Sequence, residues 1–376
     1  MNKKPDEHKL LFIIPNLDRG GSERVFTTIV QHIDLSKFDV TVVVVTRPGV
    51  YYDQLPSDIQ KILIGVYRVK YAGIALARVI NQQKPDTIFT FNVNHLNLIV
   101  IPVLLLLRFQ GALMTRESNI LSVVTAKKGK LRSIIDSVYR QLYRRVDYVI
   151  AQSTYMQQDL IRHFGISPKQ TVVVNNPIIF SKIQQLAQQQ TNVLNSDRIR
   201  LLAVGRLTYQ KGFDLLIKAI AYLPNQYHLT ILGGETYEHP EYAQELYDLV
   251  DELNLIDQVS FIGFQENPYP YMRQAALLVL PSRHEGFPNV AIEAMALGTP
   301  IIAFDSPGGQ NDLIESGENG WLVPFGDLQA LAQTVVQASQ KLPDRDDLSN
   351  SIRERYDIHS VVSSYESLLV SPNNRQ

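Results

Sequence analysis

The sequence predicts an α/β protein built from two Rossmann-like domains, each with a parallel sheet. Its 376 residues exceed the usual size of one domain and allow two domains to bury separate cores. Apolar runs of strand length recur along the chain, and most are followed by a loop and a segment with helical periodicity. Residues 199–223 repeat the strand, loop and helix order that opens the chain at residue 9. Repeated units of this kind form parallel sheets.

The first domain is expected over residues 1–185. Gly20 and Gly21 follow its first apolar run, where glycines let the backbone approach a ligand closely, although a tight turn is the other common use of a double glycine. Short apolar runs predict the strands of this domain, and residues 113–119 form a further strand end. The runs are 9–14, 40–45, 62–64, 87–90, 147–151 and 171–174.

The second domain is expected over residues 196–357, after a polar, glutamine-rich linker at about 181–195. Its opening strand, 199–204, precedes a glycine-containing loop and a helix at 213–223. Four further apolar runs predict the rest of its strands. These are 228–232, 259–262, 276–280 and 301–304.

Two acidic residues follow the strand at 276–280. Glu285 lies in the loop at the carboxyl end of that strand, where open α/β sheets bind ligands, and Glu293 lies in the following helix. The backbone N–H groups of Phe287, Asn289 and Val290 gather at the start of this helix and favour an anion. Carboxylates suit sugar and ribose hydroxyls. The alternative is that both acids are solvated surface residues.

Two cations follow the first strand of the second domain. Arg206 and Lys211 lie in the loop from Gly205 to Gly212. Arginine binds two phosphate oxygens with its fork and lysine supplies a point charge, so the pair could neutralise a diphosphate without a metal ion. The alternative is two ordinary surface cations.

The segment from Glu285 to Pro300, EGFPNVAIEAMALGTP, closely resembles the signature of family 4 of the retaining, nucleotide-sugar-dependent glycosyltransferases. Gly-Arg at 205–206 followed by Lys-Gly at 211–212 is also that family's pattern. The resemblance implies the GT-B fold, in which two Rossmann-like domains face each other across a cleft. The domain over 1–185, rejoined by a C-terminal helix at about 358–376, would bind the acceptor, and the domain over 196–357 would bind the donor.

The resemblance also implies the catalytic residues. It places Glu285 on the transferred sugar, Glu293 on the ribose, and Arg206 and Lys211 on the diphosphate. His95, which follows the strand at 87–90, would contact the donor sugar, although a lone histidine is more often structural.

Further contacts are implied on the donor and acceptor sides. Gly20 and Gly21 would face the donor diphosphate, and Phe264 belongs to a loop expected beside the nucleotide base. The polar cluster of Arg116, Glu117 and Asn119 resembles the family's acceptor-side loop, with a salt-bridged structural loop as the alternative.

The implied reaction moves a sugar, with its anomeric configuration retained, from a nucleotide diphosphate sugar, preferably a UDP-sugar. The acceptor would be a hydroxyl of a growing glycan or lipid-linked saccharide. No metal or other cofactor is expected, because no Asp-x-Asp motif occurs in a suitable loop. The alternatives are an epimerase or pyridoxal-dependent phosphorylase on the same fold, or a non-catalytic protein that binds sugar nucleotides.

The net charge of −1 is unevenly distributed. Residues 1–180 carry 23 Lys and Arg against 13 Asp and Glu, whereas residues 181–376 carry 13 against 24. Within the basic half, residues 127–145 combine apolar residues at helical spacing with seven cations and one acid, Asp136. The cations are Lys127, Lys128, Lys130, Arg132, Arg140, Arg144 and Arg145. This pattern predicts a basic amphipathic helix that docks on an anionic membrane, or else packs its apolar face on the sheet.

The expected location is the cytoplasm, with peripheral attachment at the inner face of the membrane. The sequence has no cysteine, its N-terminus lacks the pattern of a signal peptide, and its longest apolar run, 98–107, is too short to span a bilayer. No nucleic-acid partner is predicted.

Overall fold

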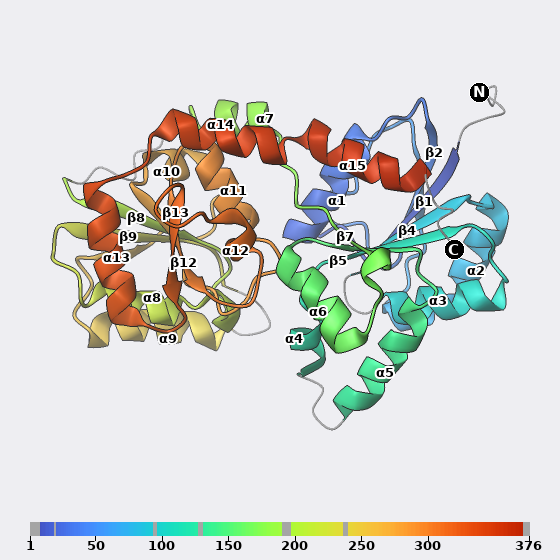
Figure 1. Cartoon of the computed structure of the whole chain (residues 1–376), viewed down its shortest axis with the longest axis horizontal. Coiled ribbons are helices and arrows are strands. Elements are labelled where there is room, and N and C mark those ends of the chain that lie inside the picture. The colour runs from blue at the N-terminus through green and yellow to red at the C-terminus, as the bar shows by residue number, and fades with distance from the viewer. Residues whose placement is uncertain are drawn as a thin grey trace. The chain divides into compact units, whose positions relative to one another are not determined.

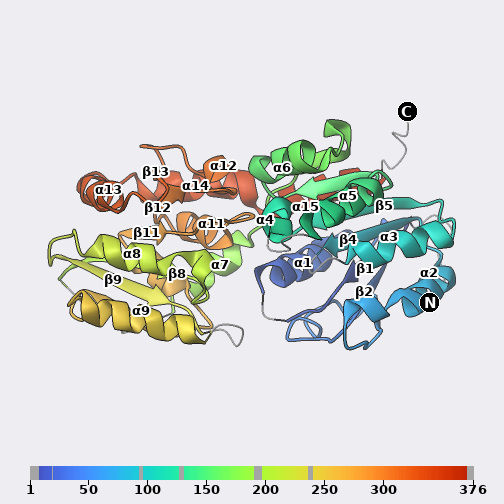
Figure 2. The same cartoon turned by 90° about the horizontal axis from the view of Figure 1, so that it is seen from below.

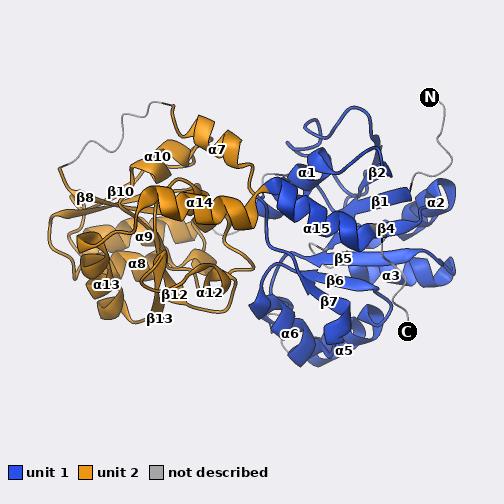
Figure 3. Cartoon of the chain, turned by 45° about the horizontal axis from the view of Figure 1, so that its top comes forward, with its two compact units in different colours: residues 1–177, 358–376 blue, residues 178–357 orange. Residues whose placement is uncertain are grey.

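The chain forms two compact units in the computed structural model (Figure 3). Unit 1 contains residues 1–177 and 358–376, and unit 2 contains residues 178–357. The chain therefore leaves unit 1 after Pro177 and returns to it at Ile358. The structure describes residues 8–18, 20–92, 96–126, 131–189, 197–235 and 240–370.

The described part of unit 1 contains a seven-stranded parallel sheet with the order β3-β2-β1-β4-β5-β6-β7. Apolar and β-branched residues dominate the central strands, which helices cover on both faces. The strands are β1 (His8–Ile14), β2 (Phe38–Val44), β3 (Gln60–Leu63), β4 (Thr87–Asn92), β5 (Ala112–Glu117), β6 (Tyr148–Ala151) and β7 (Thr171–Val173).

Helices α1 and α15 share one hydrophobic cluster on the first face of this sheet, and α2, α3, α5 and α6 share another on the opposite face (Figure 1). The helices of unit 1 are α1 (Gly21–His32), α2 (Gly73–Gln83), α3 (Asn97–Leu106), α4 (Leu121–Ala126), α5 (Arg132–Tyr143), α6 (Thr154–Phe164) and α15 (Ile358–Val370), with 3-10 turns η1 (Val69–Tyr71) and η3 (Pro168–Gln170).

The described part of unit 2 contains a six-stranded parallel sheet with the order β10-β9-β8-β11-β12-β13. Its strands are β8 (Ile199–Val204), β9 (Tyr227–Leu232), β10 (Val259–Phe261), β11 (Leu277–Leu280), β12 (Ile301–Asp305) and β13 (Gly320–Pro324). Both sheets have the strand arrangement of a Rossmann fold, and this part of the fold prediction is confirmed.

The sheet of unit 2 also lies between two layers of helices (Figure 2). One hydrophobic cluster includes α8, α9 and α13, and the other includes α7, α10, α11 and α14. The helices are α7 (Phe180–Leu186), α8 (Phe213–Ile220), α9 (Glu241–Glu252), α10 (Tyr269–Gln274), α11 (Asn289–Ala296), α12 (Gln310–Leu313), α13 (Leu328–Gln340) and α14 (Arg345–Tyr356), with the 3-10 turn η4 (Tyr209–Lys211).

The expected linker at 181–195 is partly helical. Helix α7 occupies its first residues because Ile183 packs into a core cluster of unit 2 and Gln184 donates a hydrogen bond to the carbonyl oxygen of Ala296. Residues 190–196 lie outside the described structure.

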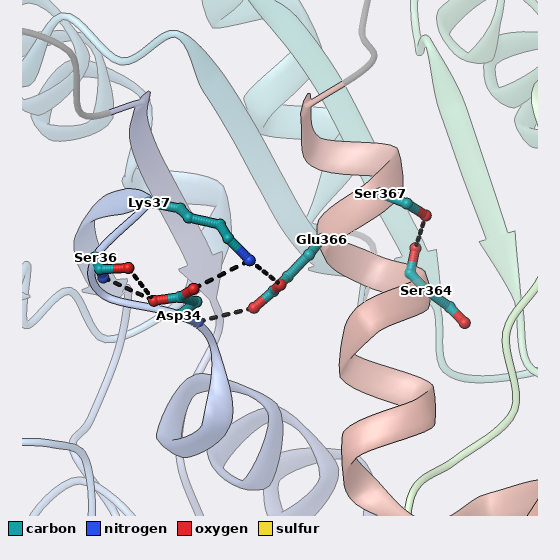
Figure 4. Close-up of polar contacts among 6 residues, drawn as sticks. All are labelled: Asp34, Ser36, Lys37, Ser364, Glu366 and Ser367. Atoms are coloured by element: carbon teal, nitrogen blue, oxygen red, sulfur yellow. Dashed lines mark hydrogen bonds and ion pairs between the residues drawn. The ribbon is translucent and has the colours of Figure 1, made fainter.

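Helix α15 is fastened to unit 1 by polar contacts as well as by its apolar face. The Glu366 carboxylate accepts a hydrogen bond from the backbone N–H of Asp34 at 2.8 Å and lies 3.4 Å from the Lys37 ammonium (Figure 4). Ser36 and Lys37 hold the pKa of Asp34 near 2 through hydrogen bonds to its carboxylate. These contacts hold the helix beside the connection between α1 and β2.

A buried arginine adds a second attachment. The Nε–H of Arg116, on β5, donates to the hydroxyl of Tyr365 on α15 at 3.0 Å. Its Nη2 donates to Asn176, next to the point where the chain leaves unit 1. The guanidinium also lies 5.2 Å from the centroid of the Phe91 ring. Arg116 therefore connects β5 to α15 and to the segment from which the chain leaves unit 1.

We expect Tyr365→Phe to destabilise the protein by about 1–3 kcal/mol, because the buried Nε–H of Arg116 loses its acceptor while the packing volume hardly changes. Urea unfolding measures the change. The exposed Tyr67→Phe is the matched control. Equal stability of the two variants would contradict this account of α15.

Candidate active site

The predicted donor residues of unit 2 gather where β8 and β11 lie side by side. The chain runs outward from β8 through β9 to β10, and the later strands β11, β12 and β13 extend on the other side. The point at which the strand order reverses is the usual ligand site of an open α/β sheet. The loop after β8 carries Arg206 and Lys211, and the loop after β11 carries Glu285.

Lys211 and Glu285 form an ion pair between these two loops. The Lys211 Nζ lies 2.6 Å from Glu285 Oε1, which also accepts a hydrogen bond from the Ser282 hydroxyl at 2.7 Å. Their side chains are only 19% and 10% exposed. The structure thus brings two predicted catalytic residues from different strands into direct contact.

The loop after β12 holds the backbone of Glu285. The Glu285 N–H donates to the carbonyl oxygen of Pro307 at 3.0 Å, and Glu285 forms a β-bridge with Gly308. A Cβ atom at Gly308 would lie 2.3 Å from the Glu285 carbonyl oxygen. Only glycine therefore permits this close approach of the two loops.

Helix α11 begins at Asn289, directly after this loop. Pro288 precedes the helix and provides no side-chain cap. The backbone N–H groups of the first turn give this end of the helix a partial positive charge. Glu293 lies just over one turn into the helix and is buried. Phe287 is also buried and packs against Tyr356, so its side chain supports the loop.

Two further predicted donor residues are exposed at strand ends. Arg206 is the second residue after β8, and Phe264, the third residue after β10, has 60% of its surface exposed. An exposed guanidinium and an exposed ring remain accessible to a phosphate and a base respectively.

A second charged contact, the fork between Arg283 and Asp214, was not predicted from the sequence. Arg283 donates from Nη1 and Nη2 to the two carboxylate oxygens of Asp214, each at 2.8 Å, and its guanidinium lies 3.6 Å from the centroid of the Tyr209 ring. Tyr242 donates its hydroxyl proton to Asp214 Oδ1 at 2.8 Å. Arg283 stands two residues before Glu285, but no local pattern connects it with Asp214.

The fork shifts the pKa values of its members. Burial acts to raise the pKa of Asp214, but hydrogen bonds from Arg283 and Tyr242 outweigh it and lower the pKa below its ordinary value. Hydrogen bonding to Asp214 raises the pKa of Arg283. Burial and the neighbouring carboxylate raise the pKa of Tyr242. Asp214 and Arg283 therefore both remain charged at neutral pH.

Unit 1 has a corresponding position between β1 and β4, where its strand order reverses. Gly20 precedes the first residue of α1, Gly21, at this edge of the sheet. Ser22 and Ser118 are joined by their hydroxyl groups at 2.7 Å. His95 lies outside the described residues, and its predicted contact with the donor sugar stays a prediction.

The structure corrects the expected setting of two acceptor-side residues. Arg116 and Glu117 belong to β5 itself, and both are buried. Arg116 contacts Tyr365 and Asn176, while the Glu117 carboxylate accepts a hydrogen bond from the hydroxyl of Tyr143. Their side chains therefore support unit 1 from inside. Asn119, beyond the strand, is exposed.

Comparison with known proteins identifies two family matches. The family described as Glycosyltransferase Family 4 matches residues 19–181, and the family described as Glycosyl transferases group 1 matches residues 184–355. Together the two matches cover most of both units.

Relatives with assigned functions match most of the chain. One is the Campylobacter jejuni N-acetylgalactosamine-N,N'-diacetylbacillosaminyl-diphospho-undecaprenol 4-alpha-N-acetylgalactosaminyltransferase, which is 28% identical and covers 86% of this chain and 88% of its own. Another is the amylovoran biosynthesis glycosyltransferase AmsD of Erwinia amylovora, which is 25% identical and covers 85% of this chain and 86% of its own.

Solved structures share the fold. Anabaena HepE in complex with UDP superposes with a TM-score of 0.79 at 23% identity, covering 96% of this chain and 100% of its own. WaaG, a glycosyltransferase involved in lipopolysaccharide biosynthesis, superposes with a TM-score of 0.71 at 18% identity, covering 96% and 100%. These neighbours have the GT-B fold, as predicted from the sequence.

The Arg283–Asp214 fork predicts an acid-sensitive contribution to stability. Because folding lowers the pKa of Asp214, its contribution is fully present above its ordinary pKa of 3.8 and is lost as the pH falls through the lower folded value. Asp214→Asn should cost about 2 kcal/mol at neutral pH and should flatten the acid limb of the stability curve. Urea unfolding across this pH range measures both effects.

Asp251→Asn, which removes an exposed carboxylate on α9, is the matched control and should leave the acid limb unchanged. If the stability of Asp214→Asn falls with acid as steeply as that of the parent, the Asp214 carboxylate is not the group that makes the stability acid-sensitive.

Proposed function

Because this chain belongs to family 4 of the glycosyltransferases, we propose that it transfers a sugar from a UDP-sugar to a hydroxyl of a lipid-linked saccharide with retention of configuration. The product would enter polysaccharide or glycoconjugate biosynthesis. The observation that carries the proposal is the Lys211–Glu285 pair beside exposed Arg206 at the β8/β11 reversal point.

The leaving diphosphate would be stabilised by the cations of unit 2. Cleavage of the bond between the sugar C1 and the phosphate oxygen leaves negative charge on that oxygen. Arg206, Lys211 and the N-terminus of α11 supply positive charge on one edge of the sheet. This arrangement supports metal-independent catalysis without another cofactor.

Glu285 and Glu293 would position the donor. Glu285 is held by Lys211 and Ser282, so its free carboxylate oxygen, Oε2, could accept a hydrogen bond from a sugar hydroxyl. Buried Glu293 would bind the ribose. The acceptor hydroxyl would attack C1 from the face that the diphosphate leaves, and its proton would pass to the departing phosphate oxygen. Catalysis would then depend on positioning and charge stabilisation.

Similar proteins support these two substrates. HepE was crystallised with UDP and with UDP and glucose, which supports a UDP-sugar donor. The Campylobacter relative is named for an acceptor on diphospho-undecaprenol, which supports a lipid-linked acceptor. We place the reaction in the cytoplasm, at the inner face of the membrane.

Helix α5 would bring the enzyme to that membrane surface. Three apolar side chains at its start and middle are exposed instead of packing on the sheet: Leu131 by 59%, Ile134 by 60% and Val138 by 42%. Only Tyr139 and Tyr143 of this helix are fully buried. An exposed apolar face next to arginines is typical of helices that lie at a membrane surface.

Four exposed cations lie on α5 or directly after it, and together with the exposed apolar residues they form the α5 surface: Arg132, Arg140, Arg144 and Arg145. Lys127, Lys128 and Lys130 lie outside the described residues. Leu105 and Leu106, at the end of α3, are 48% and 84% exposed, and Leu105 lines the same cavity as Arg144 and Arg145. Apolar and basic groups therefore occur together on α5 and near its C-terminal end. None of the described helices has the length and apolar content needed to cross a bilayer.

We expect Arg206→Ala and Lys211→Ala each to lower kcat/KM for the donor by about 30-fold, equivalent to about 2 kcal/mol, because the diphosphate loses a charged contact. Release of UDP from a panel of UDP-sugars, with and without acceptor, measures this loss. Free UDP should also raise the melting temperature of the parent protein more than that of either variant.

Lys218→Ala, which removes an exposed cation from α8, is the matched control. Parent-like kinetics in Arg206→Ala and Lys211→Ala would refute the donor site. Tight UDP binding without transfer or hydrolysis would instead favour a non-catalytic sugar-nucleotide-binding protein.

The membrane proposal predicts that replacing Arg132, Arg140, Arg144 and Arg145 by glutamine abolishes most sedimentation with anionic liposomes at low salt. Each cation near an anionic surface contributes about 1 kcal/mol, so losing four should weaken binding by at least about 100-fold. High salt should weaken the parent in the same direction.

The charge-matched control replaces four exposed cations elsewhere on unit 1, Arg68, Lys70, Arg78 and Lys84, by glutamine. If both quadruple variants sediment equally, binding depends on the net charge of the protein and the α5 surface is not the docking site.

A further inference from the structure

Two separate loops must keep a fixed relation for the candidate site to exist. Lys211 precedes α8 and Glu285 follows β11, yet their charged atoms lie 2.6 Å apart. The length of this contact depends on where the two loop backbones lie. The residue that holds them is Arg283.

The side chain of Arg283 binds both the loop before Lys211 and the helix after it. Its Nη1 donates to the carbonyl oxygen of Tyr209 at 2.7 Å, and its fork binds the Asp214 carboxylate in the first turn of α8. Its guanidinium also stacks on the Tyr209 ring. Lys211 thus lies between two points that are attached to Arg283.

Main-chain atoms of Arg283 and of the next residue, His284, also connect the two loops. The N–H of Arg283 donates to the carbonyl oxygen of Gln210 at 2.8 Å, and the Gln210 side-chain amide donates to the carbonyl oxygen of His284 at 3.0 Å. Residues 209–210 and 283–284 therefore form a continuous set of hydrogen bonds between the two loops.

Gly212 allows the loops to approach. It has a φ of +67°, and a Cβ atom there would lie 2.1 Å from the carbonyl oxygen of Pro281. Any larger residue at position 212 would push the β11 loop away and would also be strained. The backbone of Gln210, before Lys211, and that of Gly212, after it, therefore both contribute to the close contact of the loops.

We propose that Arg283 is a positioning residue that sets the geometry of the Lys211–Glu285 pair. Its fork is already occupied by Asp214, so it acts on the donor through Lys211 and does not bind phosphate itself. Lysine cannot replace it, because a single ammonium lacks the planar fork and the stacking surface. The inference rests on the proposed function for its effect on catalysis.

The test is a double-mutant cycle between Arg283→Lys and Lys211→Ala, with free UDP as the probe and calorimetric titration as the measurement. If Arg283 acts through Lys211, Arg283→Lys should weaken UDP binding by about tenfold in the parent and by less than about twofold in the Lys211→Ala background. Equal effects in both backgrounds would overturn the proposal, because a general loss of stability would act independently of Lys211.

Crystal structures of the variants test the geometry without nucleotide. In Arg283→Lys the distance from Lys211 Nζ to Glu285 Oε1 should exceed 4 Å, the limit for an ion pair. In the matched control Arg355→Lys, which alters a surface arginine paired with Glu315 elsewhere on unit 2, it should stay near 2.6 Å. A pair that stays closed in Arg283→Lys would overturn the positioning role, whereas failure of the parent to bind any nucleoside diphosphate would overturn the proposed function alone.

Discussion

The pairing of β8 with β11 is the constraint on which the candidate site depends. Parallel neighbours end at the same edge of a sheet, so the loops that follow them meet, although 74 positions in the chain separate Lys211 from Glu285. This places a cation from one loop against a carboxylate from the other. The strand ends fix the approximate positions of Lys211 and Glu285. The Arg283–Asp214 contact and the close approaches at Gly212 and Gly308 fix how the two loops lie against their neighbours.

The two units use buried charge in different ways. In unit 2 the candidate site contains two pairs of opposite charges: Lys211 with Glu285, and Arg283 with Asp214. In unit 1 the charge of Arg116 is held by neutral hydroxyl and amide groups and by an aromatic ring, and its role is to join segments distant in the chain. Similar sheets thus place charged groups at a candidate ligand site in one unit and at a structural centre in the other.

The sequence predicted what depends on periodicity and strand ends. The two parallel sheets, the strand positions other than that of β13, and the neighbourhood of Arg206, Lys211 and Glu285 followed from apolar runs and from the loops after them. The partnership of Arg283 with Asp214 could not be predicted, because nothing local links residues on different strands and helices. Arg116 was misplaced for the same reason: a charged residue near a strand end reads as a ligand contact unless its buried partners, Tyr365 and Asn176, are known.

The interrupted path of the chain sets the order in which the protein can be completed during synthesis. Unit 2 is continuous in the chain, whereas unit 1 needs α15, whose residues are translated after those of unit 2. The first face of unit 1's sheet, including Phe89 and Phe91, stays partly uncovered until then, because Tyr365 and Leu369 belong to the same hydrophobic cluster. All residues of unit 2 are therefore translated before the helix that completes the sheet of unit 1. A chain that ended before α15 would contain every residue of unit 2 but would leave part of one apolar face of unit 1's sheet uncovered.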